Sequence, residues 1–403
     1  MNPPSAHAVA MGAPAGLDHC PFMPTYGVPS VQFVSGSGVR LTDRDGKSYL
    51  DFLSGIAVTG LGHAHPEIAD AIADQARTLV HVSNLFGTVP GADVAITLDR
   101  LLGGGGQVFF TNSGAEAVEC AIKLARKFGG HGRHSIISTY GSFHGRTLGA
   151  LAATGQPSKW EGFQPLPEGF RHVVWNDLEA IEAAIDPSVV AIMLEPIQGE
   201  GGVNPATAAY FEGVRRLCDE HGLLFIVDEI QTGLGRTGEW FGFQHFGIEP
   251  DVVMMAKALG NGMPIGACWA RREVAAAFSA GDHGTTYGGQ PLAAAAARAT
   301  LAVMQRENAP QLAEHAGSYL RERLLALDGI VEVRGLGLLL AAQLADGIDA
   351  KAVVADALIA GLVLNAVSPT SIRFAPPLVV TAAEIDEAVA ILTAVLSDHG
   401  VAP

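Results

Sequence analysis

The middle of the chain alternates short apolar runs with helical patterns, and no other feature constrains the fold as strongly. The runs that read as strands are Val108–Thr111, Ser135–Ser138, Val189–Leu194, Leu223–Val227 and Val252–Ala256. Amphipathic segments lie between several of them, and Gly222 has the position of a residue that ends one of these helices. Apolar strands that alternate with helices predict an α/β fold, in which helices cover both faces of a mostly parallel sheet. Such sheets bind their ligands at the carboxyl ends of the strands.

The two ends of the chain differ from the middle. Residues 1–29 are rich in Pro and Gly and predict an irregular arm, and Asp45-Gly46 is a hairpin signal. After residue 290 we expect one Ala-rich helix to about residue 327, two strand regions, and a last helix that begins with a capping box from Thr381 to Glu384. These patterns divide the chain into an N-terminal arm with part of a small domain (1–50), a large domain (51–290) and a C-terminal small α+β domain (291–403).

Composition excludes several classes of function. The 403 residues include 25 Lys plus Arg against 41 Asp plus Glu, and the formal net charge is −16 without any basic cluster. This argues against nucleic acid and against an anionic membrane surface as partners. No uncharged apolar run is long enough to span a bilayer, the N-terminus lacks the pattern of a secretory signal, and the four cysteines are scattered without a C-x-x-C pair. We expect a cytoplasmic enzyme that acts on small molecules.

Lys257 is the residue that the strand pattern explains least. It follows the apolar run Val252–Ala256 directly, and no acid stands beside it in the sequence. An ammonium group is rarely buried without a partner. One explanation is a surface lysine whose stem covers apolar atoms while its charge reaches water. The other is a buried amine with a lowered pKa, which is a nucleophile towards carbonyl groups.

A turn between a strand and a helix follows the first apolar run, in FFTNSGAEAVECAIKLARKFGG. Ser113 and Glu116 have the spacing of a capping box, and Gly129-Gly130 ends the helix. A glycine turn that opens a helix offers free N–H groups and the positive end of the helix dipole to a phosphate. Capped turns of this kind are common without any ligand, so this turn alone does not decide between the two interpretations.

The strand Leu223–Val227 leads into a polar segment, DEIQTG. Asp228 could cap the next segment, bind a metal or hold a proton on a ring nitrogen, and Gln231 could bond to a neighbouring oxygen. Nothing nearby supplies further metal ligands. His63 and His65 also lack Cys or acid partners, so we expect no metal site.

Two glycine-rich loops carry further candidates. Phe143 and Arg146 could stack on a planar ligand and clamp a carboxylate, although a buried phenylalanine and a solvated arginine are equally ordinary. Thr285 and Thr286 could bind phosphate or serve only the loop. Together the features suggest one ligand, a phosphorylated planar ring with a basic nitrogen that is linked to the amine of Lys257. This is the chemistry of pyridoxal phosphate.

The chain resembles the class III, fold-type-I pyridoxal-phosphate aminotransferases over nearly its whole length. The resemblance rests on motifs in the family's order: LTDRDGKSYLDFLSGIAVTGLGHAHP, TNSGAEA, SFHGRTLGALAATGQP, LEPIQGEGGVNPA, VDEIQTGLGRTG, AKALGNGMPIGA, GDHGTTYGG and IRFAPPL. It implies pyridoxal 5′-phosphate as the cofactor. It also implies a large domain built on a mostly parallel, seven-stranded sheet, with a smaller α+β domain beside it.

The resemblance assigns a role to each matching position. Lys257 becomes the covalent anchor of the cofactor and the carrier of the transferred proton, and Asp228 the acid on the ring nitrogen. The other cofactor contacts are Gln231 at the ring hydroxyl, Phe143 stacked on the ring, the N–H groups of Gly114 and Ala115 at the phosphate, Ser113 as the cap of that helix, and Thr286 at the phosphate in the neighbouring subunit's site. The substrate contacts are Thr285, Arg146, Arg373 for the α-carboxylate of glutamate, and Glu200, which pairs with Arg373 when an ω-amino substrate is bound. A site shared in this way implies a homodimer.

The motifs are most similar to those of family members that use N²-acetylornithine. The implied reaction moves an amino group between N²-acetyl-L-ornithine and 2-oxoglutarate in two stages. Gln290 stands where the family more often has Asn, and Val118 where this group often has Asn, so the exact substrate is less firmly implied than the chemistry. Succinyldiaminopimelate, ornithine and 4-aminobutyrate remain open as amino donors. An aminomutase with the same cofactor and a non-catalytic binding protein also remain open.

Overall fold

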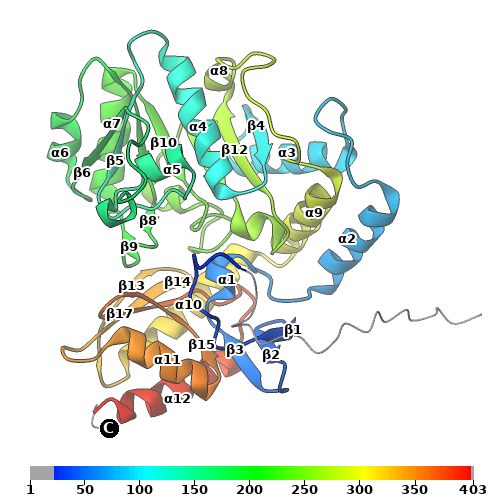
Figure 1. Ribbon diagram of the computed structural model, residues 1–403, viewed down its shortest axis with the longest axis vertical. Coiled ribbons are helices and arrows are strands. Elements are labelled where there is room, and N and C mark those ends of the chain that lie inside the picture. The colour runs from blue at the N-terminus through cyan, green and yellow to red at the C-terminus, as the bar shows by residue number, and fades with distance from the viewer. Residues whose placement is uncertain (1–21, 401–403) are drawn as a thin grey trace, which may run out of the picture.

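A seven-stranded sheet forms the centre of the larger half of the molecule (Figure 1). The computed structural model describes residues 22–400. The strands lie in the order β4 (Gly106–Thr111), β12 (Gly266–Arg271), β11 (Val252–Met255), β10 (Leu224–Asp228), β7 (Val189–Leu194), β5 (Ser135–Thr139) and β6 (Phe170–Val173). β12 runs antiparallel to both of its neighbours, and the other neighbouring pairs are parallel. The prediction of an α/β fold with a mostly parallel sheet is confirmed.

Helices cover both faces of this sheet, as the apolar strands require. Along β10, Leu224 and Ile226 belong to the apolar cluster on the side of α4 (Gly114–Gly129), α5 (Leu148–Ala153) and α8 (Arg272–Ala275). Phe225 and Val227 belong to the cluster on the opposite side. That cluster includes residues of α3 (Val89–Leu101), α6 (Leu178–Ala183), α7 (Ala208–His221) and α9 (Pro291–Arg306). Gly222 ends α7 in the left-handed conformation, as predicted.

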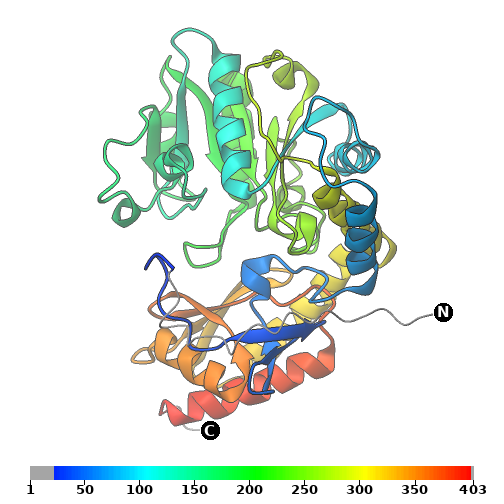
Figure 2. The ribbon, with the colours of Figure 1, turned by 45° about the vertical axis from the view of Figure 1, so that its right-hand side comes forward.

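A second, smaller half is built on two four-stranded sheets. One is antiparallel, in the order β13 (Ile330–Leu336), β14 (Leu339–Leu344), β17 (Ser371–Phe374) and β16 (Asn365–Ser368). The other joins β1 (Phe33–Ser37), β2 (Arg40–Asp43) and β3 (Ser48–Asp51) to β15 (Leu362–Val363), so segments far apart in the chain lie side by side (Figure 2). The predicted hairpin at Asp45-Gly46 is confirmed, and Gly46 has the positive φ of 85° that this turn needs. We call the two halves the large and the small domain.

The prediction of one helix from residue 291 to about 327 is wrong. The structure has two helices there, α9 and α10 (Ala309–Leu325), and the chain breaks at Asn308, which has a φ of 53°. Asparagine tolerates this left-handed conformation better than most residues, and Pro310 then lacks the N–H that a continuous helix would use. The last helices are α11 (Ala350–Ala360) and α12 (Ala382–Asp398), and the predicted capping box of Thr381 and Glu384 is confirmed.

The remaining elements connect the two domains or extend them. They are α1 (Ser54–Ala57), α2 (Pro66–Thr78) and a small hairpin of β8 (Ile197–Gln198) and β9 (Asn204–Pro205). The predicted arm over residues 1–29 lies outside the described residues as far as residue 21. Between residues 22 and 400, none of the helices combines the length and the apolar character needed to cross a bilayer.

Candidate active site

A cavity of about 390 Å³ opens at the carboxyl ends of the central strands. This is where the fold class places ligands. Its walls include most of the site residues predicted from the sequence, namely Ser113, Gly114, Ala115, Phe143, Arg146, Glu200, Asp228, Gln231 and Lys257. Three predicted residues, Thr285, Thr286 and Arg373, do not line it. Within residues 22–400, no group of three or more His, Cys, Asp or Glu side chains is arranged to hold a metal ion.

Lys257 enters the cavity from the end of β11. The four residues of β11 are fully buried and hold the backbone rigid up to this point. Lys257 then adopts a φ of 44°, in the left-handed region that is costly for a side chain of this size. No residue between 22 and 400 forms a hydrogen bond or ion pair with its amine. Burial, together with Arg373, lowers the pKa of Lys257 to about 8 although Glu200 and Asp228 oppose the shift, so a fraction of the amine is neutral near pH 7.

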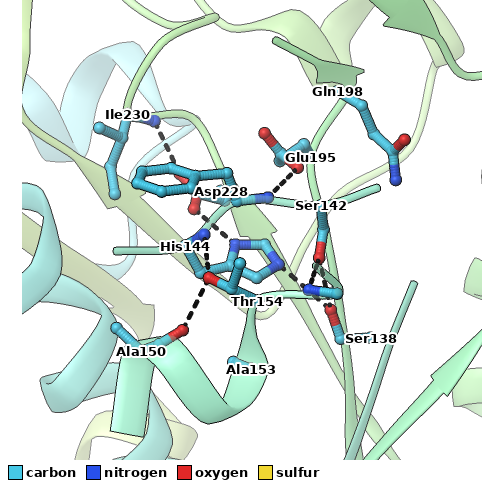
Figure 3. A network of polar contacts seen from close by, with 12 residues as sticks. Ser138, Ser142, His144, Ala150, Ala153, Thr154, Glu195, Gln198, Asp228 and Ile230 are labelled. Carbon is cyan, nitrogen blue, oxygen red and sulfur yellow. Dashed lines mark hydrogen bonds and ion pairs between the residues drawn. The ribbon is translucent and has the colours of Figure 1, made fainter. Parts of the chain in front are cut away.

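Asp228 is held at the end of β10 by groups from two segments (Figure 3). Its Oδ1 accepts the N–H of Ile230 at 3.0 Å, and its Oδ2 lies 2.8 Å from Nδ1 of the buried His144. The other ring nitrogen of His144 lies 3.3 Å from Ser138 Oγ, and the backbone N–H of His144 donates to Thr154 Oγ1 at 2.9 Å. The imidazole therefore fixes the position of the carboxylate.

Two acids near Asp228 differ sharply in their surroundings. Glu229 is a structural cap, because its carboxylate accepts from Thr232 Oγ1 (2.6 Å), Gly242 N–H (2.9 Å) and Phe243 N–H (2.8 Å).

Glu195 faces the cavity and accepts one N–H, that of Phe143, at 3.1 Å. Burial and the nearby Asp228 raise the pKa of Glu195 well above its usual range, which favours the protonated form of this carboxyl group.

The first turn of α4 forms a cradle for an anion. Ser113 Oγ accepts the N–H of Glu116 at 3.3 Å, as predicted. The reciprocal half of the predicted capping box is wrong: Glu116 Oε2 accepts from the N–H and the side chain of Asn112, at 2.9 and 2.8 Å, one residue before the cap. The N–H groups at the start of a helix have no partner within it, and they point out of its end. A Cβ on Gly114 would lie 2.9 Å from Ile230, so a side chain there would intrude into the wall of the cradle.

Two arginines in or beside the site can hold carboxylates. Arg373 comes from β17 of the small domain and is fully buried, with Nη1 2.5 Å from Glu200 Oε1 and Nε 3.0 Å from Asn365 Oδ1. Its Nη2 is buried without a hydrogen-bond partner between residues 22 and 400, as expected of a donor that waits for a ligand. Burial would raise the pKa of Glu200, but Arg373 and Lys257 outweigh it and hold that pKa below its usual value. Arg146 is exposed, with its guanidinium 5.6 Å from the centre of the Phe143 ring.

The two threonines lie beside the cavity but not in it. Thr285 Oγ1 accepts from the side chain of Asn112 at 3.1 Å, which ties its loop to the start of α4. Thr286 faces away, into a small hollow that it shares with His81, Ser83 and Phe86. The structure of this chain therefore does not bring Thr286 together with the other predicted cofactor contacts.

Sequence reasoning missed two residues of the site, His144 and Glu195. His144 stands next to Phe143 in SFHGRTLGA and Glu195 stands in LEPIQGEGG, but no residue pattern around either indicates a role in the site. The partner of His144 is Asp228, 84 positions away, and no short sequence motif indicates a contact between residues so far apart.

Comparison with known proteins agrees with this geometry. The family model "Aminotransferase class-III" matches residues 23–396, and the chain belongs to this family. An acetylornithine aminotransferase of Corynebacterium efficiens is 50% identical over 93% of this chain and 94% of its own length. One of Caldanaerobacter subterraneus subsp. tengcongensis is 48% identical over 93% of this chain and 97% of its own. The crystal structure of ornithine aminotransferase from Toxoplasma gondii ME49 superposes with a TM-score of 0.89 at 34% identity, covering 94% of this chain and 93% of that one.

Class III aminotransferases use pyridoxal 5′-phosphate, and the residues of the cavity fit that group. The turn at Gly114 leaves space and N–H donors for a phosphate. Asp228 is a fixed carboxylate of the kind that can pair with a protonated ring nitrogen, and the amine of Lys257 lies in the same cavity, where it could react with a carbonyl group. The chain is therefore a pyridoxal-phosphate-dependent transaminase.

Proposed function

We propose that this transaminase moves an amino group between N²-acetyl-L-ornithine and 2-oxoglutarate, giving N-acetyl-L-glutamate 5-semialdehyde and L-glutamate, a step of arginine biosynthesis. Eight curated relatives named acetylornithine aminotransferase, 44–50% identical over 90–94% of this chain, support the choice of substrate. The observation that carries the proposal is the contact of Glu200 with the buried Arg373 beside Lys257.

This contact suits an enzyme that must accept two substrates of different shape. Glutamate presents the α-amino group next to its α-carboxylate, so it needs a free arginine close to Lys257. N²-acetylornithine presents a terminal amine with no carboxylate nearby, so the same arginine must then be neutralised. We assign this neutralisation to Glu200, which pairs with Arg373 for N²-acetylornithine and leaves it for glutamate. We assign the distant carboxylate to Arg146, which reaches the mouth of the cavity.

When bound, pyridoxal phosphate supplies an electron sink for the carbon that loses its proton. The residues of the chain do the rest. We assign Asp228, fixed by His144, to keep a proton on the ring nitrogen, Gln231 to the ring hydroxyl and Phe143 to the ring face. The N–H groups of Gly114 and Ala115, in the turn capped by Ser113, hold the phosphate. The amine of Lys257 anchors the cofactor and, once released, takes the proton from one carbon and returns it to the other.

We further propose a homodimer with shared active sites, in the cytoplasm. Large apolar side chains are exposed around Thr286: Phe86 (69%) shares its hollow, Tyr287 (61%) follows it in sequence, and Leu85 (86%) and Val89 (69%) stand next to residues of that hollow. A surface of this kind favours burial against another protein. Thr286 would then reach the phosphate in the partner's site and Thr285 would lie near its substrate. Mixing Lys257→Ala with Thr286→Ala subunits tests this, because a hybrid dimer then has one complete site. Activity that does not recover on mixing would contradict the shared site.

The substrate is tested by a panel of amino donors with 2-oxoglutarate as acceptor. We expect N²-acetylornithine to have a higher kcat/KM than ornithine, succinyldiaminopimelate or 4-aminobutyrate. The likeness to the Toxoplasma enzyme makes ornithine the second candidate, and faster turnover of ornithine would replace our choice. An aminomutase would act without 2-oxoglutarate, so a strict need for this acceptor separates the two reactions.

A further inference from the structure

The hairpin of β8 and β9 carries Glu200 at its tip and reaches from the large domain to the sheet of the small domain (Figure 1). Ile197 and Val203 flank the tip and are buried in an apolar cluster with Leu339, Ala341 and Ala375 of the small domain. The tip is therefore packed against the same sheet that supplies Arg373. Its position depends on contacts across the boundary between the domains.

Arg334 of β13 holds the backbone of this tip. Its Nε donates to the carbonyl of Gly202 at 2.8 Å. Its terminal nitrogens donate to Gln343 Oε1 at 3.2 Å and to Ser371 Oγ at 2.9 Å. Ser371 Oγ also donates to Gln343 at 2.7 Å, so the guanidinium is fixed on its own sheet while it binds the tip.

The backbone of the tip has little freedom, unlike the side chain of Glu200. A Cβ on Gly201 would lie 2.6 Å from the carbonyl oxygen of Gly141, which shows how closely the two backbones approach. Gly202 has a φ of 116°, which residues with a side chain rarely adopt. The side chain of Glu200, by contrast, is 32% exposed and has space to leave Arg373.

We propose that Arg334 is a positioning residue for the exchange of the two substrates: it fixes the tip, so that the side chain of Glu200 alone swings to and from Arg373. The inference rests on the proposed function, in which Glu200 masks Arg373 for N²-acetylornithine. A loosened tip weakens the short contact of Glu200 with Arg373 and leaves the arginine free. The loss then falls on N²-acetylornithine and spares glutamate, which needs Arg373 free.

Arg334→Gln tests this against a matched control, Arg321→Gln. Arg321 of α10 binds the same strand, donating to the carbonyls of Val333 and Gly335, and these bonds stay within the small domain. Hydrogen exchange of the peptide Ile197–Pro205, measured without substrate, should become roughly tenfold faster in Arg334→Gln, the change expected for one lost charged hydrogen bond. The ratio of kcat/KM for N²-acetylornithine to that for glutamate should also fall roughly tenfold. Arg321→Gln should leave both values at the wild-type level.

Unchanged exchange in Arg334→Gln, or faster exchange with an unchanged donor ratio, overturns the proposal. If Arg334→Gln does not fold, Arg334→Lys serves in its place, since lysine keeps the charge but cannot make the three bonds of the guanidinium. Wild-type enzyme that does not use N²-acetylornithine would refute the proposed function instead. The exchange measurement needs no substrate and would still report whether Arg334 anchors the tip.

Discussion

The substitution His144→Phe tests whether the hydrogen bond from His144 to Asp228 contributes to cofactor binding. Phenylalanine keeps a ring of similar shape, but it removes the hydrogen bond that holds Asp228 Oδ2 at 2.8 Å. A hydrogen bond to a charged group contributes about 1.5–3 kcal/mol, which corresponds to roughly a ten- to hundredfold loss of affinity when the bond supports a ligand. Ile230 still holds the other oxygen at 3.0 Å, so Asp228 stays in place but is less well supported.

The assay is a titration of the apoenzyme with pyridoxal phosphate, followed by absorbance. His172→Phe is the matched control, because His172 is a partly buried histidine nearby whose ring bonds to the carbonyl of Ala153 at 3.1 Å and not to Asp228. We expect a weaker Kd in His144→Phe and a Kd close to wild type in His172→Phe, with thermal unfolding showing that both variants fold. Equal affinity in the two variants would refute the argument that His144 acts through Asp228.

Three further predictions concern single groups of the cavity. Because the pKa of Lys257 is about 8, capture of pyridoxal phosphate by the apoenzyme should rise with pH through this value and level off about one pH unit above it, as stopped-flow absorbance can show. A rate that is still climbing steeply near pH 10 would speak against the lowered pKa. Gly114→Ala, with its Cβ 2.9 Å from Ile230, should cost about 1–3 kcal/mol of stability and weaken phosphate binding, and an unchanged thermal unfolding with and without cofactor would contradict the cradle. Burial raises the pKa of Glu195 and favours its neutral form, so we expect Glu195→Gln to keep the cofactor affinity and to remove one protonated-carboxyl band from the infrared spectrum. A spectrum without that loss would mean that Glu195 is ionised.

The strands that could be predicted are those whose apolar character is continuous. Five of the seven strands of the large sheet were expected within a residue or two of their bounds. The other two strands were not predicted, because their residues are not typical of strands. β6 contains Arg171 and His172, and β12 begins with Gly-Ala and consists largely of small residues. β6 thus has only two apolar residues, which do not alternate with polar ones, and β12 has no β-branched residue, so neither has the pattern by which a strand is recognised.

In the site, too, residues could be predicted from the neighbouring sequence, whereas contacts between residues far apart in the chain could not. Lys257 and Asp228 could be found because each follows a buried strand, and the carboxyl ends of parallel strands meet at one edge. The contacts that orient them come from elsewhere in the chain, His144 for Asp228 and Arg373 for Glu200. A single sequence carries no local signal for a pair of this separation, so these contacts emerged only from the folded chain. The break at Asn308 is different, since its Asn and Pro signals were present and were outweighed by the Ala-rich pattern.

In the proposed mechanism, amino transfer from N²-acetylornithine takes place at Lys257, and one labelling experiment tests this directly. Borohydride fixes the cofactor on the lysine that holds it, and peptide mass spectrometry identifies that lysine. We predict a label on Lys257 in the enzyme as purified, no label after N²-acetylornithine is added without an acceptor, and a restored label once 2-oxoglutarate follows. A label on another lysine, or a label on Lys257 that N²-acetylornithine does not remove, would contradict this mechanism.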